Sequence, residues 1–171
     1  VLLAVSYYYG AIRGTSDSPS VYSVILYQNT DNEWTTLLEG IRQAEEDFGL
    51  KVNYVNMSTG DTAQEQAELI RREIDSGVSG ILFAAVDSKA LGDALKDDNI
   101  QIPLVALETG ISGISSSNYF SITGDDYGMG QALGQKILKD MEEQGSQRVV
   151  TVIREYMERD SVSQRYEGLV D

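Results

Sequence analysis

The stretch that decides the fold runs from Tyr22 to Trp34 and reads Tyr22-Ser-Val-Ile-Leu-Tyr-Gln-Asn-Thr-Asp-Asn-Glu-Trp34. An apolar, β-rich segment gives way to a polar loop with Asp31, Glu33 and the only Trp of the chain, directly before an amphipathic helical pattern. In open α/β folds, small ligands bind outside the carboxyl ends of the strands. The sequence therefore predicts a ligand-binding edge here, where Trp34 offers a flat apolar face.

The composition is that of an acidic globular chain. Its 171 residues are 42% hydrophobic and 23% charged, which is enough apolar content for a packed core. A nucleic-acid partner is not expected, because phosphate backbones would repel a chain of formal net charge −14, although such charge also simply keeps a protein soluble. The chain has no Cys and no His, so thiolate sites are excluded and the commonest general base is missing. We predict no catalytic residue, metal site or cofactor.

The chain begins with an apolar block, residues 1–10, which contains three consecutive Tyr residues. It is shorter than the ~20 residues that span a bilayer, and its Tyr residues suit a membrane interface. We interpret residues 1–20 as the remnant of a membrane anchor or signal sequence, followed by a linker. The alternative is an ordinary strand or helix that packs on the domain, because length alone does not separate the two.

Beyond residue 20, β-rich segments alternate with helical patterns. This order predicts right-handed βαβ crossovers, and therefore an α/β fold with a parallel sheet. In the first helix, the spacing of Trp34, Leu38 and Phe48 predicts that they share one inward face. Strands are expected at 21–26, 51–57, 80–86, 103–107, 120–123 and 149–153, and helices at 33–48, 62–76, 88–95, 127–144 and 160–168.

Five segments, in their order along the chain, carry a family resemblance. They are Glu39-Gly-Ile-Arg-Gln-Ala-Glu-Glu-Asp-Phe-Gly49, Gly80-Ile-Leu-Phe-Ala-Ala-Val-Asp87, Ile102-Pro-Leu-Val-Ala-Leu-Glu108, Gly124-Asp-Asp-Tyr-Gly-Met-Gly130 and Asp160-Ser-Val-Ser-Gln-Arg-Tyr-Glu-Gly168. Together they resemble the type I periplasmic sugar-binding proteins, which include the ribose- and galactose-binding proteins and the effector domains of lactose-repressor-type regulators. The resemblance implies two α/β lobes that close on a small solute about a hinge.

The resemblance also implies a division of the chain. Residues 21–123 would form the N-terminal α/β lobe, and residues 124–171 would begin a C-terminal α/β lobe that is only partly present. A partial lobe is expected to expose apolar faces that a complete lobe buries.

Matches to the family imply candidate ligand-binding residues. Asp31, Glu33 and Trp34 match the position of the first loop, where carboxylates accept hydrogen bonds from hydroxyls and Trp stacks on a sugar ring. Glu108 matches an acid of the sugar-binding relatives, and Thr109 stands where those relatives often have Arg. The residues of the first loop have a structural alternative, because Trp34 fits a helix core and Asp31 and Glu33 suit the capping of a helix N-terminus.

Two further candidates complete the expected site. Arg165 matches the ligand-binding Arg of the second lobe, and its five donors suit hydroxyls or a carboxylate. Its alternative role is an ion pair with Glu167 or Asp160. Tyr27 ends the first strand and is expected to border the pocket.

The function that the resemblance implies is extracytoplasmic binding of a small polar solute. A monosaccharide is the first candidate, and the acidic site residues also suit an amine-bearing solute. The partner would be the permease of an ABC importer. Alternatively, the protein would be a membrane-anchored sugar sensor domain that signals to a histidine kinase. A glycosidase using Glu33 and Glu108 is a remote alternative that needs two carboxyl groups about 5–9.5 Å apart; we expect no enzymatic activity.

Overall fold

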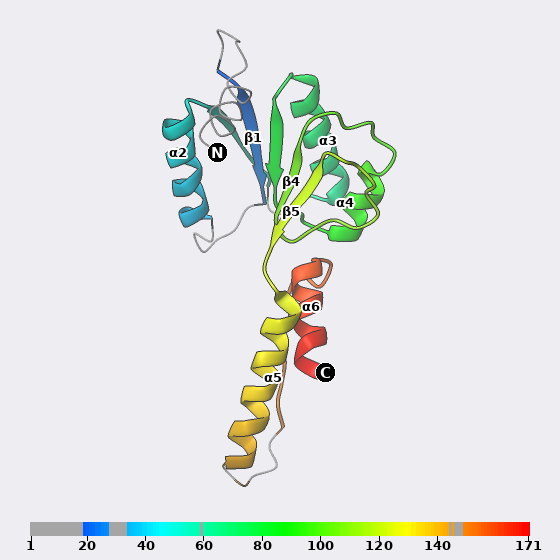
Figure 1. The fold of residues 1–171 in the computed structure, drawn as a ribbon. Coiled ribbons are helices and arrows are strands. Elements are labelled where there is room, and N and C mark those ends of the chain that lie inside the picture. Colours follow the sequence, from blue (N-terminus) through cyan, green and yellow to red (C-terminus); the bar gives the residue numbers. More distant parts are fainter. Residues whose placement is uncertain (1–18, 28–33, 59, 144, 146–148) are drawn as a thin grey trace, which may run out of the picture.

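The computed structural model describes residues 19–27, 34–58, 60–143, 145 and 149–171 (Figure 1). Within this part of the chain, a single sheet has the strand order β2-β1-β3-β4-β5, and every pairing is parallel. The predicted α/β class with a parallel sheet is therefore confirmed. The strands are β1 (Val21–Leu26), β2 (Lys51–Asn56), β3 (Gly80–Phe83), β4 (Leu104–Glu108) and β5 (Tyr119–Thr123).

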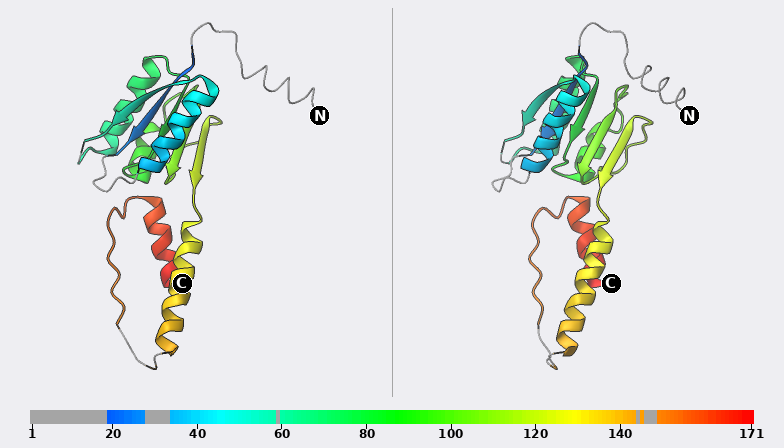
Figure 2. Two further views of the ribbon diagram at one scale, coloured as in Figure 1. Left: turned by 90° about the vertical axis from the view of Figure 1, so that its left-hand side faces the viewer. Right: turned by 60° about the vertical axis from the view of Figure 1, so that its left-hand side comes forward.

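Helices cover both faces of the sheet. Helix α2 (Thr35–Phe48) lies on one face, whereas α3 (Ala63–Asp75) and α4 (Ser88–Leu95) lie on the other (Figures 1 and 2). The strand period of two divides the core accordingly, because Ile25 joins the cluster under α3 and α4 while Val24 and Leu26 join the cluster under α2. We call this layered part, residues 21–123, the α/β unit.

Local sequence signals explain where these helices begin and end. Thr62 and Glu65 form a capping box at the start of α3, as the sequence predicts. The side chain of Asp87 accepts a hydrogen bond from the backbone N–H of Ala90 and so caps α4. At the end of α2, Gly49 adopts φ 64°, a left-handed conformation that favours glycine.

Helix α2 packs more loosely on the sheet than the sequence predicts. Trp34 and Leu38 contact the cluster on their face of the sheet, as expected. Phe48, which the periodicity places on the same inward face, is 66% exposed, so that expectation is wrong. The residues of this helix that pack on the cluster lie near its start and middle, at Leu37, Leu38 and Ile41, and Phe48 in the last turn is not among them.

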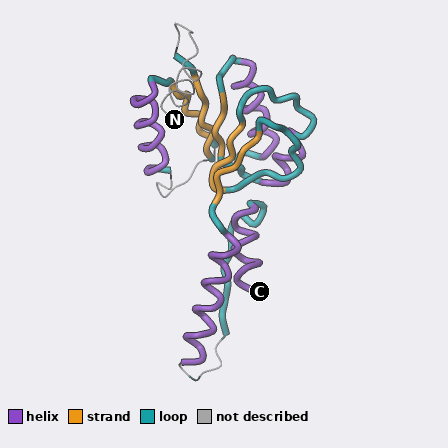
Figure 3. The backbone as a smooth tube through the Cα atoms, in the orientation of Figure 1, coloured by secondary structure: helices purple, strands orange, loops and turns teal. Residues whose placement is uncertain are grey.

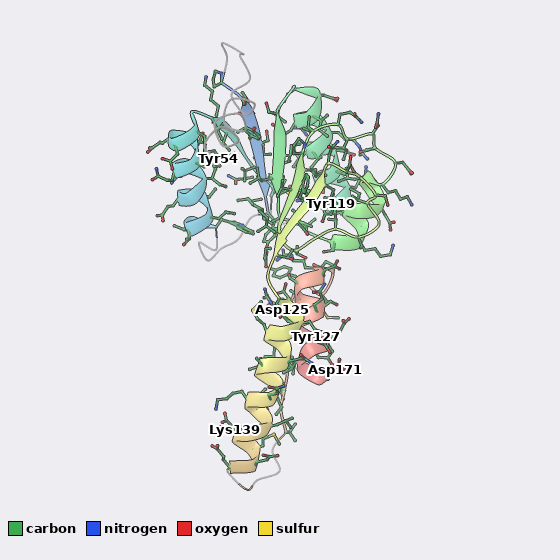
Figure 4. The ribbon with its side chains drawn as sticks, viewed as in Figure 1. Tyr54, Tyr119, Asp125, Tyr127, Lys139 and Asp171 are labelled. Atoms are coloured by element: carbon green, nitrogen blue, oxygen red, sulfur yellow. The ribbon has the colours of Figure 1, made fainter. Side chains whose placement is uncertain are left out.

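The remaining helices form a pair outside the sheet. Helix α5 (Asp126–Glu143) follows β5 and lies beside α6 (Asp160–Val170) (Figure 1). Glycine allows the close contact, because a Cβ atom at Gly130 would lie 2.1 Å from the carbonyl oxygen of Arg165. Tyr127 on α5 also donates a hydrogen bond to Asp171 (Figure 4), which raises the pKa of the tyrosine, because this bond keeps the hydroxyl protonated.

The strand predicted at 149–153 is absent. Residues 149–156 have no regular secondary structure (Figure 3) and stand apart from α5 in the views of Figure 2. A β-strand needs a hydrogen-bonded neighbour, and the described sheet contains none beside this segment. As a result, apolar side chains that a sheet would bury are open to solvent, with Val149 94% exposed.

Residues 1–18, interpreted from sequence as an anchor remnant, lie outside the described residues. Among the described helices, none combines the length and apolar character that crossing a membrane requires.

Candidate functional site

A cleft of about 730 Å³ lies where the carboxyl ends of the strands meet the first turn of α6. Tyr27 and Glu108 reach it from the ends of β1 and β4. Arg159, directly before α6, and Arg165, within α6, reach it from the other side. We call this space the interlobe cleft. Parallel strands bring their carboxyl ends to one edge of the sheet, so its position is the one that the sequence predicts for a ligand site.

Tyr27 and Glu108 meet across the cleft edge of the sheet. The hydroxyl of Tyr27 donates to Oε2 of Glu108 over 2.6 Å, which joins the ends of two strands that flank β3. Glu108 has a backbone φ of 66°, a conformation that costs a residue with a side chain about 1–2 kcal/mol. Backbone strain of this kind concentrates at functional sites, and here it directs a carboxylate into the cleft.

Trp34 stands behind Tyr27 rather than in the described lining of the cleft. Its Nε1 donates to the backbone oxygen of Tyr27 over 3.1 Å, and the two rings meet edge to face with centroids 5.0 Å apart. The indole also packs on the cluster under α2. These contacts let Trp34 support the position of Tyr27, and they agree with the alternative interpretation as a residue of the helix core. Its contact with a ligand stays a prediction.

Arg165 faces the cleft but already has a partner. Its Nε lies 2.5 Å from Oδ1 of Asp126, a buried carboxylate in the first turn of α5. The ion pair that the sequence left open therefore forms with Asp126 and not with Glu167 or Asp160. This pair ties the starts of α5 and α6 together and leaves the remaining donors of Arg165 at the cleft.

Thr109 lies below the cleft in a buried contact between the α/β unit and α6. Its side chain is 1% exposed, and its hydroxyl lies 3.1 Å from that of Ser88. The backbone N–H of Ser161 donates to the Thr109 hydroxyl over 3.2 Å, and the N–H of Asp160 donates to the Ser88 hydroxyl over 2.9 Å. We call these four residues the hydroxyl contact; it fastens the first turn of α6 to the sheet.

Asp31 and Glu33, the two remaining candidates, lie outside the described residues. In the part of the chain that the structure describes, no group of three or more acidic side chains is arranged to hold a metal ion.

Sequence reasoning missed Arg159 and Tyr156, which both line the cleft. The guanidinium carbon of Arg159 lies 3.7 Å from the ring centre of Tyr27 and 4.1 Å from that of Tyr156. No local pattern marks either residue, because the segment before α6 has no helical or strand period. The one available signal was an Arg directly before a helix start, and that signal is also typical of exposed residues.

The pKa of Asp160, beside the site, is shifted. Burial raises the pKa of the Asp160 carboxyl above its ordinary value, and the negative charges of Asp87 and Glu167 add to the shift.

The comparisons with known proteins fit this geometry. A model of the periplasmic binding protein domain matches residues 22–171. The chain belongs to the periplasmic binding protein family. No curated protein matches the sequence.

Solved structures share the type I fold of this family. They include the myo-inositol-bound myo-inositol binding protein of Caulobacter, with a TM-score of 0.70, 17% identity, and coverage of 91% of this chain and 52% of that one. A carbohydrate transporter solute-binding protein of Agrobacterium radiobacter, in complex with D-arabinose, has a TM-score of 0.68 and 18% identity. The match covers 91% of this chain and 52% of that one. The fructose-binding periplasmic domain of a hybrid two-component system has a TM-score of 0.63 and 21% identity, with coverage of 87% of this chain and 48% of that one. The chain thus spans about half the length of these structures, and identities this low establish the fold alone.

Proposed function

We propose that this periplasmic binding protein chain takes part in extracytoplasmic binding of a monosaccharide, held in the interlobe cleft between the α/β unit and α6. The observation that supports this most directly is the convergence of Glu108, Tyr27 and Arg159 at the carboxyl edge of a parallel sheet. A carboxylate accepts a hydrogen bond from a sugar hydroxyl, and a guanidinium donates one to the hydroxyl oxygen. The cleft can therefore pair with a sugar hydroxyl both as donor and as acceptor.

The two sides of the cleft belong to different parts of the chain. Tyr27 and Glu108 come from the α/β unit, whereas Arg159 lies directly before α6 and Arg165 within it. A solute that contacts both sides binds best when they are close together, so its binding favours the closed arrangement. This is the hinge closure that the resemblance implies.

A thermal-shift experiment on the intact protein tests the proposal. D-Arabinose, D-fructose, D-glucose, D-galactose and myo-inositol are screened, because binding to the folded state raises stability by about 2.7 kcal/mol at a hundredfold excess over Kd. We expect a shift with at least one of them. Glu108→Gln removes the charge while keeping the shape, and we expect it to abolish that shift.

The matched control is Glu39→Gln, an exposed acid on α2 that lies away from the cleft. It should leave the shift unchanged. If none of the sugars stabilises the unmodified protein, the proposed function is wrong; if Glu108→Gln binds normally, Glu108 is removed from the site.

Uptake by an ABC importer is the first proposed use of this binding, and sugar sensing is the second. The similarity to the periplasmic domain of a hybrid two-component system supports sugar sensing as the second use. Membrane attachment through residues 1–20 would suit a sensor. Crosslinking of the intact protein in its host cell separates the two, because capture of a permease indicates uptake and capture of a histidine kinase indicates sensing.

A further inference from the structure

Arg159 is held in an unusual environment. It is the residue that precedes α6, and its side chain is only 8% exposed. The guanidinium lies between the rings of Tyr27 and Tyr156, at 3.7 Å and 4.1 Å from their centres. Two aromatic faces hold the cation by electrostatic attraction and fix the orientation of its plane.

This guanidinium lacks a hydrogen-bond acceptor within the described residues. Its Nε is buried and unpaired, and no carboxylate in this part of the chain lies within ion-pair distance. Arg71 and Arg165, by contrast, pair with Asp98 and Asp126. A buried donor without an acceptor is unfavourable, so the acceptor that Arg159 needs is expected from a bound molecule.

The other charged groups of the cleft are mostly acceptors. Asp61, Asp87, Glu108 and Glu158 line the same space as Arg159. Asp61 and Asp87 each accept one backbone N–H, from Ser58 over 2.6 Å and from Ala90 over 2.7 Å, and keep further lone pairs. The cleft therefore presents several acceptors around one preorganised set of donors.

We propose that Arg159 is the specificity-determining residue of the cleft: it donates hydrogen bonds to oxygen atoms of a neutral, polyhydroxylated solute and rejects amine-bearing cations. This inference rests on the proposed function and names the class of solute. Each hydroxyl donates to a carboxylate and accepts from Arg159. An ammonium group cannot accept, and the charge of Arg159 repels it.

The number of charged groups in the cleft would, by itself, favour a cationic ligand over a neutral one. Four carboxylates against two arginines, one of which is paired with Asp126, would attract a cationic amine. Arg159 opposes that attraction at close range, where desolvation makes charge interactions strong. Removing Arg159 should therefore weaken the binding of neutral sugars and at the same time improve the relative binding of amino sugars.

The test is isothermal titration of the intact protein with whichever sugar of the screen it binds, and with the amino-deoxy analogue of that sugar. Arg159→Met keeps most of the apolar stem. We expect it to weaken the neutral sugar about 10- to 100-fold, the loss typical of a hydrogen bond from a charged group. The preference for the neutral sugar over its amino analogue should shrink as well.

Two further variants make the result specific. Arg159→Lys keeps the positive charge but not the planar set of donors, so it should also lose affinity for the neutral sugar. Arg154→Met is the matched control, because Arg154 lies 3.6 Å above the ring of Tyr166, outside the lining of the cleft. It should bind both compounds like the unmodified protein, and unfolding without sugar checks that each variant is folded.

The outcomes separate this inference from the proposed function. If the unmodified protein binds no sugar, both the proposed function and this inference are wrong. If it binds sugar and folded Arg159→Met or Arg159→Lys binds it equally well, only the inference is overturned. Equal loss of the neutral sugar and its amino analogue in Arg159→Met also overturns it, because a merely structural role would have that effect.

Discussion

At the scale of single residues, Asp160 connects burial to pH. It begins α6 and lies beside the hydroxyl contact, where its backbone N–H is bonded to Ser88. Because burial raises the pKa of its carboxyl, the folded protein binds this proton more tightly than the unfolded chain does. The contribution of Asp160 to the free energy of unfolding should therefore increase as the pH falls through the raised pKa, down to the ordinary value of 3.8.

Comparison with Asp160→Asn measures this contribution, since the amide resembles the protonated acid. We expect the variant to gain stability relative to the unmodified protein above the raised pKa, where the buried carboxyl is charged. That relative gain should disappear as the pH falls below 3.8, where the carboxyl is protonated in both the folded and the unfolded state. Urea unfolding across the pH range gives the difference, and a difference independent of pH would contradict the assignment.

Residue positions at strand ends were predictable, whereas their partners were not. Tyr27 and Glu108 follow apolar β-rich runs, so the sequence places both at the carboxyl edge, and the structure joins them by a hydrogen bond. The environment of Arg159 depends on rings from two distant segments, which no local period reveals. Thr109 was noticed beside Glu108, but its burial against Ser161 requires knowledge of where α6 lies.

At the scale of elements, caps and glycines proved the most reliable signals. The Thr62 capping box and Gly49 mark helix ends through local hydrogen bonds and backbone conformation, which need no distant partner. The segment 149–153 failed as a predicted strand for the opposite reason. Its apolar, β-branched composition suits a sheet, yet a strand forms only where a neighbouring strand supplies hydrogen bonds.

The contact between α5 and α6 makes a prediction at this scale. At Gly130, an added Cβ would lie 2.1 Å from the carbonyl oxygen of Arg165, and backbone cannot move as a flexible side chain can. Gly130→Ala should therefore separate the helices and destabilise the protein by about 1–3 kcal/mol, as overpacking does. Thermal unfolding measures the effect.

Gly40→Ala is the matched control for that substitution. Gly40 lies in α2, and no atom lies within 4 Å of the position that its Cβ would take. Alanine should stabilise the helix there by about 0.5–1 kcal/mol, because glycine is the poorer helix former. Equal effects at Gly40 and Gly130 would show that the close contact between α5 and α6 does not govern stability.

At the scale of the whole molecule, the cleft exists because α6 is fastened to the α/β unit. Its two sides come from these two parts, so their relative position decides whether Glu108 and Arg159 can contact the same solute. The hydroxyl contact is one described polar link between these two parts, and the hydrogen bond from the N–H of Ser88 to the backbone oxygen of Glu158 is another. Stability and solute affinity should therefore change together when the hydroxyl contact is broken.

Thr109→Val tests that coupling, because it keeps the shape of the side chain and removes its hydroxyl. The N–H of Ser161 and the hydroxyl of Ser88 then lose a buried partner, which should cost about 1–3 kcal/mol in unfolding free energy. Sugar affinity should also fall, because the closed arrangement becomes a smaller fraction of the folded protein. Thr36→Val, on the exposed side of α2, should change neither quantity. A folded Thr109→Val protein that binds sugar with unchanged affinity would show that α6 keeps its position without the Thr109 hydroxyl. The link between α6 and the α/β unit would then have to come from other contacts, such as the hydrogen bond that the backbone N–H of Ser88 donates to the backbone oxygen of Glu158 over 2.9 Å.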